Sequence, residues 1–347
     1  MIGFRYHVVS IVAVLLALTV GLVLGTTVLQ DPVMQRLSSD ANETREQLAE
    51  MQEHRDLAQS RVAGADELLD AYAGEILGGR LDGVRVVLVE APGAEDGVSS
   101  ELIDRFDQAG ATVTGQLRLT ETYVDPEERV FLDELTTQLA SGVDLPDGDA
   151  HRRAGTQLAH ALLDPAGAEA EPGQGDTDAA VEESSAQLDA GTVVEGFDQA
   201  GLVTTVGDPQ AGADIAVLVA SGASAPTTDD SGAVDTSTDT DTAMLALGEA
   251  LATVGASGAV VAGPPTTADR GLIERVYQAQ TRITTVDSAD TSAGAVATAL
   301  AVASTVDGRL GRYGVGPYTE SFLPAEVPER EPLAHDGADD SDEVEDT

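Results

Sequence analysis

The sequence predicts an α/β protein with an N-terminal transmembrane helix, a coiled-coil stalk and a Rossmann-like, open, mostly parallel sheet that carries disordered acidic insertions. Three observations support this prediction: an uncharged apolar stretch over residues 8–29, an apolar heptad over 32–78, and strand-like runs that alternate with amphipathic segments over 82–323. Residues 1–7 form the expected cytoplasmic N-terminus, and residues 324–347 form the expected disordered acidic tail.

Composition excludes several classes of function. The 347 residues contain 18 Lys and Arg against 61 Asp and Glu, a formal charge of −43, and every one of the bases is Arg. A chain this acidic repels polyphosphates, and with 3% aromatic residues and no Trp it has little to stack on bases, so no nucleic-acid partner is expected. The lack of Cys removes disulfides, thiolate metal ligands and Cys nucleophiles. A hydrophobic content of 42% suffices for a core, which must consist of Ala, Val, Leu and Ile.

The apolar stretch at 8–29 has the length of a membrane-spanning helix. Its 22 residues can cross a hydrocarbon core of roughly 30 Å at about 1.5 Å per residue. A cleaved signal peptide is the alternative, but its apolar region runs about 7–15 residues and ends in a small-residue cleavage site, which residues 25–30 lack. Arg5 precedes the stretch and acidic residues follow it, which favours a cytoplasmic N-terminus with the remainder outside.

Small residues recur at every fourth position inside this predicted helix. Ala13, Ala17, Gly21 and Gly25 lie on one stripe, where two helices can approach closely. Self-association of the membrane helix is therefore one prediction. The alternative is chance, because apolar helices are rich in Ala and Gly.

A heptad repeat follows the membrane segment, beginning near Asp31 and Pro32, which are suited to cap a helix. The apolar seam positions that we predict to mediate oligomerisation are Met34, Leu37, Leu48, Met51, Val62, Leu69 and Ile76. An unbroken seven-residue repeat favours a left-handed coiled coil, in which Arg55 is a polar seam residue that fixes register. The alternative is one long amphipathic helix that lies on its own domain.

Strands and helices alternate after the stalk. Strands are expected over 84–89, 111–119, 202–206, 215–219, 259–261 and 283–286. Helices are expected around 98–106, 131–139, 158–162, 244–254, 268–279 and 293–304. Two acidic linkers without any base, over 164–190 and 223–242, are expected to be disordered.

Catalytic and cofactor motifs are missing from the sequence. It contains no dinucleotide fingerprint, Walker A loop, HExxH or GxSxG pattern, so we expect no enzyme activity and no cofactor. The glycine-rich segment 311–316 follows a helix and is expected to be a turn rather than a phosphate cradle. A small ligand, if one binds, is expected at the strand ends 91–93, 221–222 and 263–265.

The residues that could ligate a metal are scattered, and the metal ligands are left unknown. His151 and His160 share a predicted helix but lie nine residues apart, on opposite faces. The four Met residues form no cluster for a cuprous ion. The Asp residues of 229–241 lack the glycine and terminal Glu of a calcium loop.

Several segments resemble the mycobacterial copper transport protein B (MctB) family. They are FRYHVVSIVAV at 4–14, LTVGLVLG at 18–25, VVLVEAPG at 86–93, GRYGVG at 311–316 and FLP at 322–324, together with the acidic helix after the first segment. The resemblance implies a copper transport protein of the actinobacterial cell envelope that helps to keep intracellular copper low, and it implies copper ions as a partner. It also implies an outer-membrane channel as one location and role.

Three functions remain open at this stage. In the first, an oligomer forms or gates a path for copper. In the second, the same oligomer is a membrane-anchored scaffold that presents the α/β domain to envelope partners. In the third, the edge of the sheet holds a catalytic site with no familiar motif.

Overall fold

A computed structural model of the chain provides the structure. It describes residues 3–28, 30–140, 143–163, 190–222, 236–268 and 271–325. These divide into two compact units, Met1–Ala65 and Asp66–Thr347. The predictions of disorder over 164–189, 223–235 and 326–347 lie outside the described residues.

The N-terminal unit contains the predicted apolar helix. Helix α1 spans Gly3–Val28, and its stretch Tyr6–Val23 is long and apolar enough to cross a membrane, with none of it buried in the protein. No residue of this stretch is charged, so the helix has no polar face. A helix that packs on a soluble core has one apolar face and one polar face. An N-terminal apolar helix that fits a membrane is therefore confirmed.

Helix α2 is a single helix of 48 residues, Gln30–Leu77. It begins just before the Asp31 and Pro32 pair that was expected to start it, a difference within the usual uncertainty of a helix end. Its last residues belong to the second unit, where Ala73 and Leu77 are fully buried. Residues 78–84 then lead directly into the first strand of the sheet.

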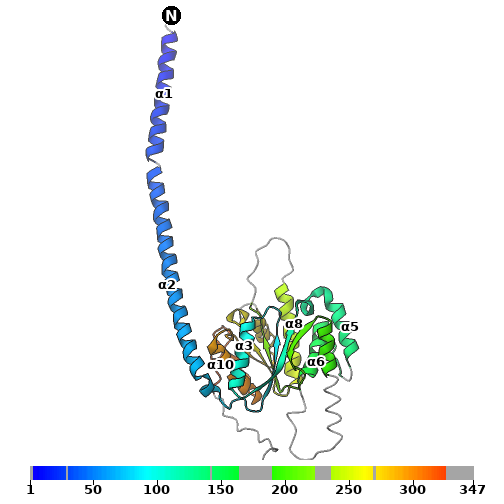
Figure 1. The fold of residues 1–347 in the computed structure, drawn as a ribbon. Helices are drawn as coiled ribbons and strands as arrows, with labels where there is room; N and C mark the ends of the chain where they lie inside the picture. Colours follow the sequence, from blue (N-terminus) through cyan, green and yellow to red (C-terminus); the bar gives the residue numbers. More distant parts are fainter. Residues whose placement is uncertain are drawn as a thin grey trace, which may run out of the picture. The chain divides into compact units, whose positions relative to one another are not determined.

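The second unit is built on one seven-stranded sheet (Figure 1). Its strands are β1 (Arg85–Glu90), β2 (Thr112–Leu119), β3 (Val203–Gly207), β4 (Ile215–Val219), β5 (Ala259–Ala262), β6 (Ile283–Val286) and β7 (Arg312–Tyr313). They lie in the order β3-β2-β1-β4-β5-β6-β7, and every neighbouring pair is parallel except β2 and β3. The predicted mixed α/β fold with a mostly parallel sheet is confirmed.

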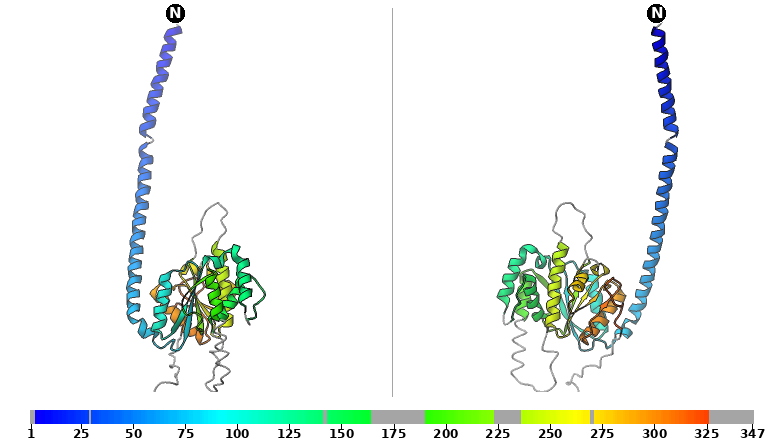
Figure 2. Two further views of the ribbon diagram at one scale, coloured as in Figure 1. Left: turned by 45° about the vertical axis from the view of Figure 1, so that its right-hand side comes forward. Right: turned by 180° about the vertical axis from the view of Figure 1, so that it is seen from behind.

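Helices cover both faces of this sheet (Figure 2). They are α3 (Asp96–Gln108), α4 (Glu121–Val124), α5 (Arg129–Leu139), α6 (Ala150–Leu162), a helix over 190–199, α8 (Thr236–Val254), α9 (Leu272–Ala279) and α10 (Ser292–Val306), with short 3-10 helices at Pro126–Glu128 and Pro265–Ala268. The core against one face includes the end of α2, α3 and α10, and the core against the other includes α4, α5, α6, α8 and α9. Both cores are mainly aliphatic, as predicted, although Phe106, Phe197 and Tyr123 are also fully buried.

The structure corrects one boundary of the acidic linkers. Residues 236–242 were expected to be disordered but form the start of α8. Two acids in this start are paired with bases: Asp239 lies 2.9 Å from Arg129 and Asp241 lies 3.6 Å from Arg275. Acids near a helix N-terminus are also stabilised by the helix dipole. Composition alone does not show this stabilisation.

Candidate functional site

The loops that follow the parallel strands meet at one edge of the sheet, as expected for the three predicted ligand-binding segments. The amide of Ala91 donates to Val219, that of Ala220 donates to Ala262, and that of Gly263 donates to Val286, at 2.8–3.0 Å. Segments 91–93, 221–222 and 263–265 therefore lie at adjacent strand ends. Backbone hydrogen bonds to the neighbouring strands hold the start of each loop in place at this carboxyl edge.

Glu90 is the charged residue at the end of β1, and it is completely buried. Its Oε2 accepts from Nε of Arg118 at 2.7 Å, and Arg118 also reaches Asp96 at 2.8 Å. The hydrogen bond to Glu90 raises the pKa of Arg118, which keeps the guanidinium charged. The other carboxylate oxygen of Glu90, Oε1, is buried without a hydrogen-bond partner. A buried carboxylate of this kind depends on its single basic partner.

The glycine-rich segment 311–316 wraps around a carboxylate of the same chain. Oδ1 of Asp287, just after β6, accepts from the amide of Val315 at 2.7 Å, and Oδ2 accepts from the amide of Gly316 at 2.8 Å. Gly314 has a φ of +124°, and a Cβ there would lie 1.9 Å from Oδ1 of Asp287. The predicted turn is thus a carboxylate-binding loop, and the carboxylate that its amides bind is Asp287 of the same chain.

Negative charge gathers at the carboxyl edge. Glu95 is the N-cap of α3, Asp96 lies in its first turn, and Asp290 follows β6. Burial raises the pKa of Asp290, and the nearby charges of Glu95 and Asp287 add to this effect. Acids at the start of α3 take the place that phosphates occupy at helix N-termini of nucleotide-binding sheets, so this edge repels anions.

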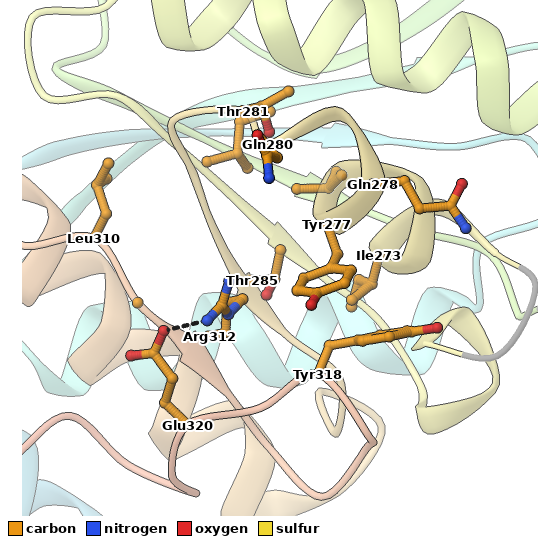
Figure 3. A pocket seen from close by; sticks show the side chains of 13 residues that line it. Ile273, Tyr277, Gln278, Gln280, Thr281, Thr285, Leu310, Arg312, Tyr318 and Glu320 are labelled. Carbon is orange, nitrogen blue, oxygen red and sulfur yellow. Dashed lines mark ion pairs between the residues drawn. The ribbon is translucent and has the colours of Figure 1, made fainter.

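A cavity of about 510 Å³ lies elsewhere, between α9 and the β6–β7 end of the sheet (Figure 3). The rings of Tyr277 and Tyr318 stack at 4.4 Å between centroids, and the guanidinium of Arg312 lies 5.3 Å from the centroid of Tyr277. Arg312 also forms an ion pair with Glu320 at 2.7 Å. Figure 3 shows the side chain of Thr285 beside Arg312. The cavity therefore offers hydroxyl groups and one neutralised ion pair to a small polar molecule.

The candidate metal ligands do not come together. His151 is buried with Nε2 3.0 Å from the carbonyl oxygen of Tyr123, whereas His160 is exposed. Burial lowers the pKa of His151, which favours the neutral imidazole. Met244 lies in the domain core, and Met51 is exposed on α2. Among the residues described here, no group of three or more His, Cys, Asp or Glu is arranged to hold a metal ion.

The predicted oligomerisation residues of α2 lie along the helix with their side chains largely exposed. Leu48, Met51 and Val62 keep 54%, 70% and 51% of their surface in contact with solvent. Ile76 is also exposed, and Leu69 is half-buried. The predicted residues Met34 and Leu37 belong to α2 by their backbone, but their side chains lie outside the described set. The described seam residues are thus left mostly uncovered.

The small-residue stripe of α1 is likewise on an exposed helix. Ala13 and Ala17 are exposed, and nothing lies within 4 Å of the position that a Cβ of Gly21 would take. The backbone of Gly25 is part of α1, and the surroundings of this residue lie outside the described set. The stripe remains available for close approach by a second helix.

Three of these features were not predicted. Glu90 and Asp287 are acids at the ends of apolar strand runs, and that position is a sequence signal for a buried, specifically bonded carboxylate. The Tyr277 and Tyr318 stack joins residues far apart in the chain, which no local pattern indicates.

An apolar helix that fits a membrane, followed by an acidic, mostly parallel α/β unit, defines a membrane-associated α/β protein. The chain belongs to the MctB family. The family profile, described as "Copper transport outer membrane protein, MctB", matches residues 1–324.

Curated relatives agree with this family. The chain is 27% identical over 332 residues to "Copper transporter MctB" of Mycobacterium tuberculosis (strain ATCC 25618 / H37Rv), covering 91% of this chain and 97% of the relative. The protein of the same name from Mycobacterium bovis gives the same values. That of Mycobacterium leprae (strain TN) is 30% identical over 164 residues, covering 47% of this chain and 48% of the relative. The names of the family and of these relatives indicate copper transport.

Proposed function

We propose that this protein acts in copper transport and homeostasis at the cell envelope, where it helps to keep intracellular copper low as a subunit of an oligomeric, non-enzymatic membrane assembly. The observation that carries the proposal is the family match over residues 1–324. It extends over α1, α2 and the α/β unit together, so the likeness concerns the whole architecture rather than a shared domain. The Rossmann-like sheet serves in this proposal as a scaffold without nucleotide chemistry.

The topology that we propose places the N-terminus in the cytoplasm and the acidic domain outside. Arg5 precedes the apolar helix, and the segments beyond it are strongly acidic. Protease treatment of spheroplasts tests this arrangement. Digestion of the α/β domain without lysis supports the proposed topology, and protection of the domain reverses it.

Copper passage or regulation, rather than tight storage, is the mode that we propose. The sequence offers no Cys and four Met as soft ligands, and Met51 and Met244 lie in different units. The acidic carboxyl edge, with Glu95, Asp96 and Asp290, supports only weak attraction of cations. In chelator competition, the purified full chain should therefore show no sub-nanomolar cuprous affinity. A tight stoichiometric site would contradict this mode while leaving the family intact.

Copper content of cells tests the transport function directly. Cells that lack the protein should accumulate more copper than the parent strain under copper stress, and the full chain supplied in trans should restore the parental level. Zinc content serves as the control and should not change. An unchanged copper content would remove the transport function.

The exposed seam of α2 favours a second function, a membrane-anchored scaffold that presents the α/β domain to envelope partners without moving copper. Leu48, Met51 and Val62 form an interaction surface whether or not copper passes. The two functions separate in one experiment. If the deletion leaves copper content at the parental level although the protein self-associates through this seam, copper transport is excluded and the scaffold is supported.

A further inference from the structure

The face that α2 leaves uncovered near the domain leads to an inference about how two copies meet. We infer that α2 pairs with α2 of a second copy of this chain in parallel and in register, and that the pairing continues to the last turn of the helix, beside the α/β domain. The inference rests on the self-association in the proposed function and adds its orientation, its register and its extent.

The domain itself contacts another side of α2. Within the second unit, Ala73 and Leu77 are fully buried, and Asp70 pairs with Arg105 of α3. The heptad seam in the same stretch stays largely outward: Tyr72 is 51% and Ile76 38% exposed, and Leu69 is half-buried. The domain therefore anchors the helix end by residues beside the seam. A partner helix can lie on the seam without displacing the domain.

The charges beside the seam match a parallel, in-register partner. In such a pair each position g faces position e of the next heptad of the other helix, five residues on. Arg61 then faces Asp66 of the second copy. Residues five apart in one helix lie about 140° apart around its axis, so Arg61 and Asp66 do not meet within a chain. The complementarity therefore operates only between copies.

Most of the remaining acids of the helix avoid the seam and its borders. They occupy the outward heptad positions b, c and f: Glu43, Glu46, Glu50, Glu53, Asp56, Glu67 and Asp70. The exceptions are Asp31 at position e and Asp40 and Glu75 at position g. In a chain of net charge −43, this distribution keeps like charges apart when two helices pair.

The membrane helix selects the parallel orientation. α1 precedes α2 in each copy, and copies inserted in the same sense place their α2 helices side by side in the same direction. The seam from Leu48 to Ile76, apolar apart from Arg55, is its own complement in that arrangement, because each seam residue meets the same residue of the partner. Arg55 then meets Arg55, a polar position that costs stability and fixes the register.

Cysteine cross-linking in the full chain tests register and extent, because the native sequence contains no Cys. Val62→Cys and Ile76→Cys place a thiol at seam positions, and Glu67→Cys places one on the outer face as the matched control. After mild oxidation of membranes, both seam variants should give disulfide-linked dimers and the control should not. A monomeric Ile76→Cys protein, or equal cross-linking of Glu67→Cys, would overturn the inference.

A charge exchange tests the pairing of g with e. Arg61→Glu in the Val62→Cys background should slow cross-linking about tenfold, because two symmetric attractions become repulsions. Adding Asp66→Arg should restore the rate. If the double variant is as slow as the single one, the in-register pair is wrong. Measuring copper content with the same variants keeps the outcomes distinct: cross-linking without any copper phenotype leaves this pairing intact and removes only the transport function.

Discussion

The α/β domain and helix α2 use the same aliphatic side chains in opposite ways. Val87 and Leu88 of β1 lie fully buried between two layers of helices, whereas Leu48, Met51 and Val62 of α2 keep half or more of their surface exposed. The domain therefore contains the partners for its own apolar surface. The long helices leave most of their apolar surface uncovered by their own chain: α1 fits a membrane, and α2, as inferred above, meets a second copy.

Truncating one leucine in each region should give the largest difference. Leu88→Ala should lower the free energy of unfolding of the domain by about 2–5 kcal/mol, because it leaves a cavity in the sheet core. Leu68→Ala, at an exposed position of α2, should change it by less than about 0.5 kcal/mol. Urea unfolding followed by tyrosine fluorescence measures both, since the chain has six Tyr and no Trp. Equal losses of stability for the two variants would contradict the difference between the domain core and α2.

Removing Arg118 should be the next largest perturbation of the domain. Arg118→Ala leaves Glu90 buried without its basic partner and should cost about 2–4 kcal/mol, toward the lower end because the Arg118 side chain is 45% exposed. The double variant with Glu90→Leu should recover most of this loss. If the double variant is no more stable than Arg118→Ala, the unpaired charge of Glu90 is not the cause of the loss of stability.

The Asp287 loop gives a smaller and more local effect. Asp287→Asn retains one of the two acceptor oxygens that hold Val315 and Gly316, and it should cost about 1–2 kcal/mol. Limited proteolysis should then cut within 311–325 sooner than in the parent. Asp104→Asn, at an exposed position of α3, is the matched control and should leave the cleavage rate unchanged.

The smallest expected effect is a pH dependence that belongs to the domain alone. Burial lowers the pKa of His151 in the folded state, although nearby Asp149 and Asp239 oppose this and Arg129 adds to it. The unfolded state then binds more protons, so His151 contributes stability above pH of about 6.5 that is lost as the pH falls through its folded pKa, with a slope of at most about 1.4 kcal/mol per pH unit. His151→Gln should flatten the curve between pH 7 and 5.

Exposed His54 on α2 provides the control for this measurement. Its side chain is 75% exposed, so His54→Gln makes the same substitution outside the domain core. A His151→Gln protein with the parental slope would show that other groups carry the dependence.

Long apolar runs made most of the sheet predictable. The run at 84–89 predicted β1, and the runs at 215–219 and 283–286 predicted β4 and β6, because strands buried on both faces contain few polar residues. The two residues of β7 are too few to form a pattern, and the direction of β3 depends on tertiary packing. The coiled coil remains a prediction.

The candidate site was less predictable than the fold. The convergence of segments 91–93, 221–222 and 263–265 follows from parallel strands, whose carboxyl ends share one edge. The pairing of Glu90 with Arg118 depends on the register of β1 and β2, which shifts at an irregularity between Val86 and Val87. The hydrophobic pattern of the sequence does not indicate that shift in register.

The direct passage from α2 into β1 has a mechanical consequence. Residues 78–84 connect the helix to the strand that lies between β2 and β4, and both neighbours are parallel to it. Tension applied through the membrane anchor would pull along β1 and load the hydrogen bonds on its two sides in shear. Bonds loaded in shear must break together rather than one at a time. The tether thus enters the domain at a central strand that is hydrogen-bonded on both sides, and the Arg105 and Asp70 pair joins the helix end to α3.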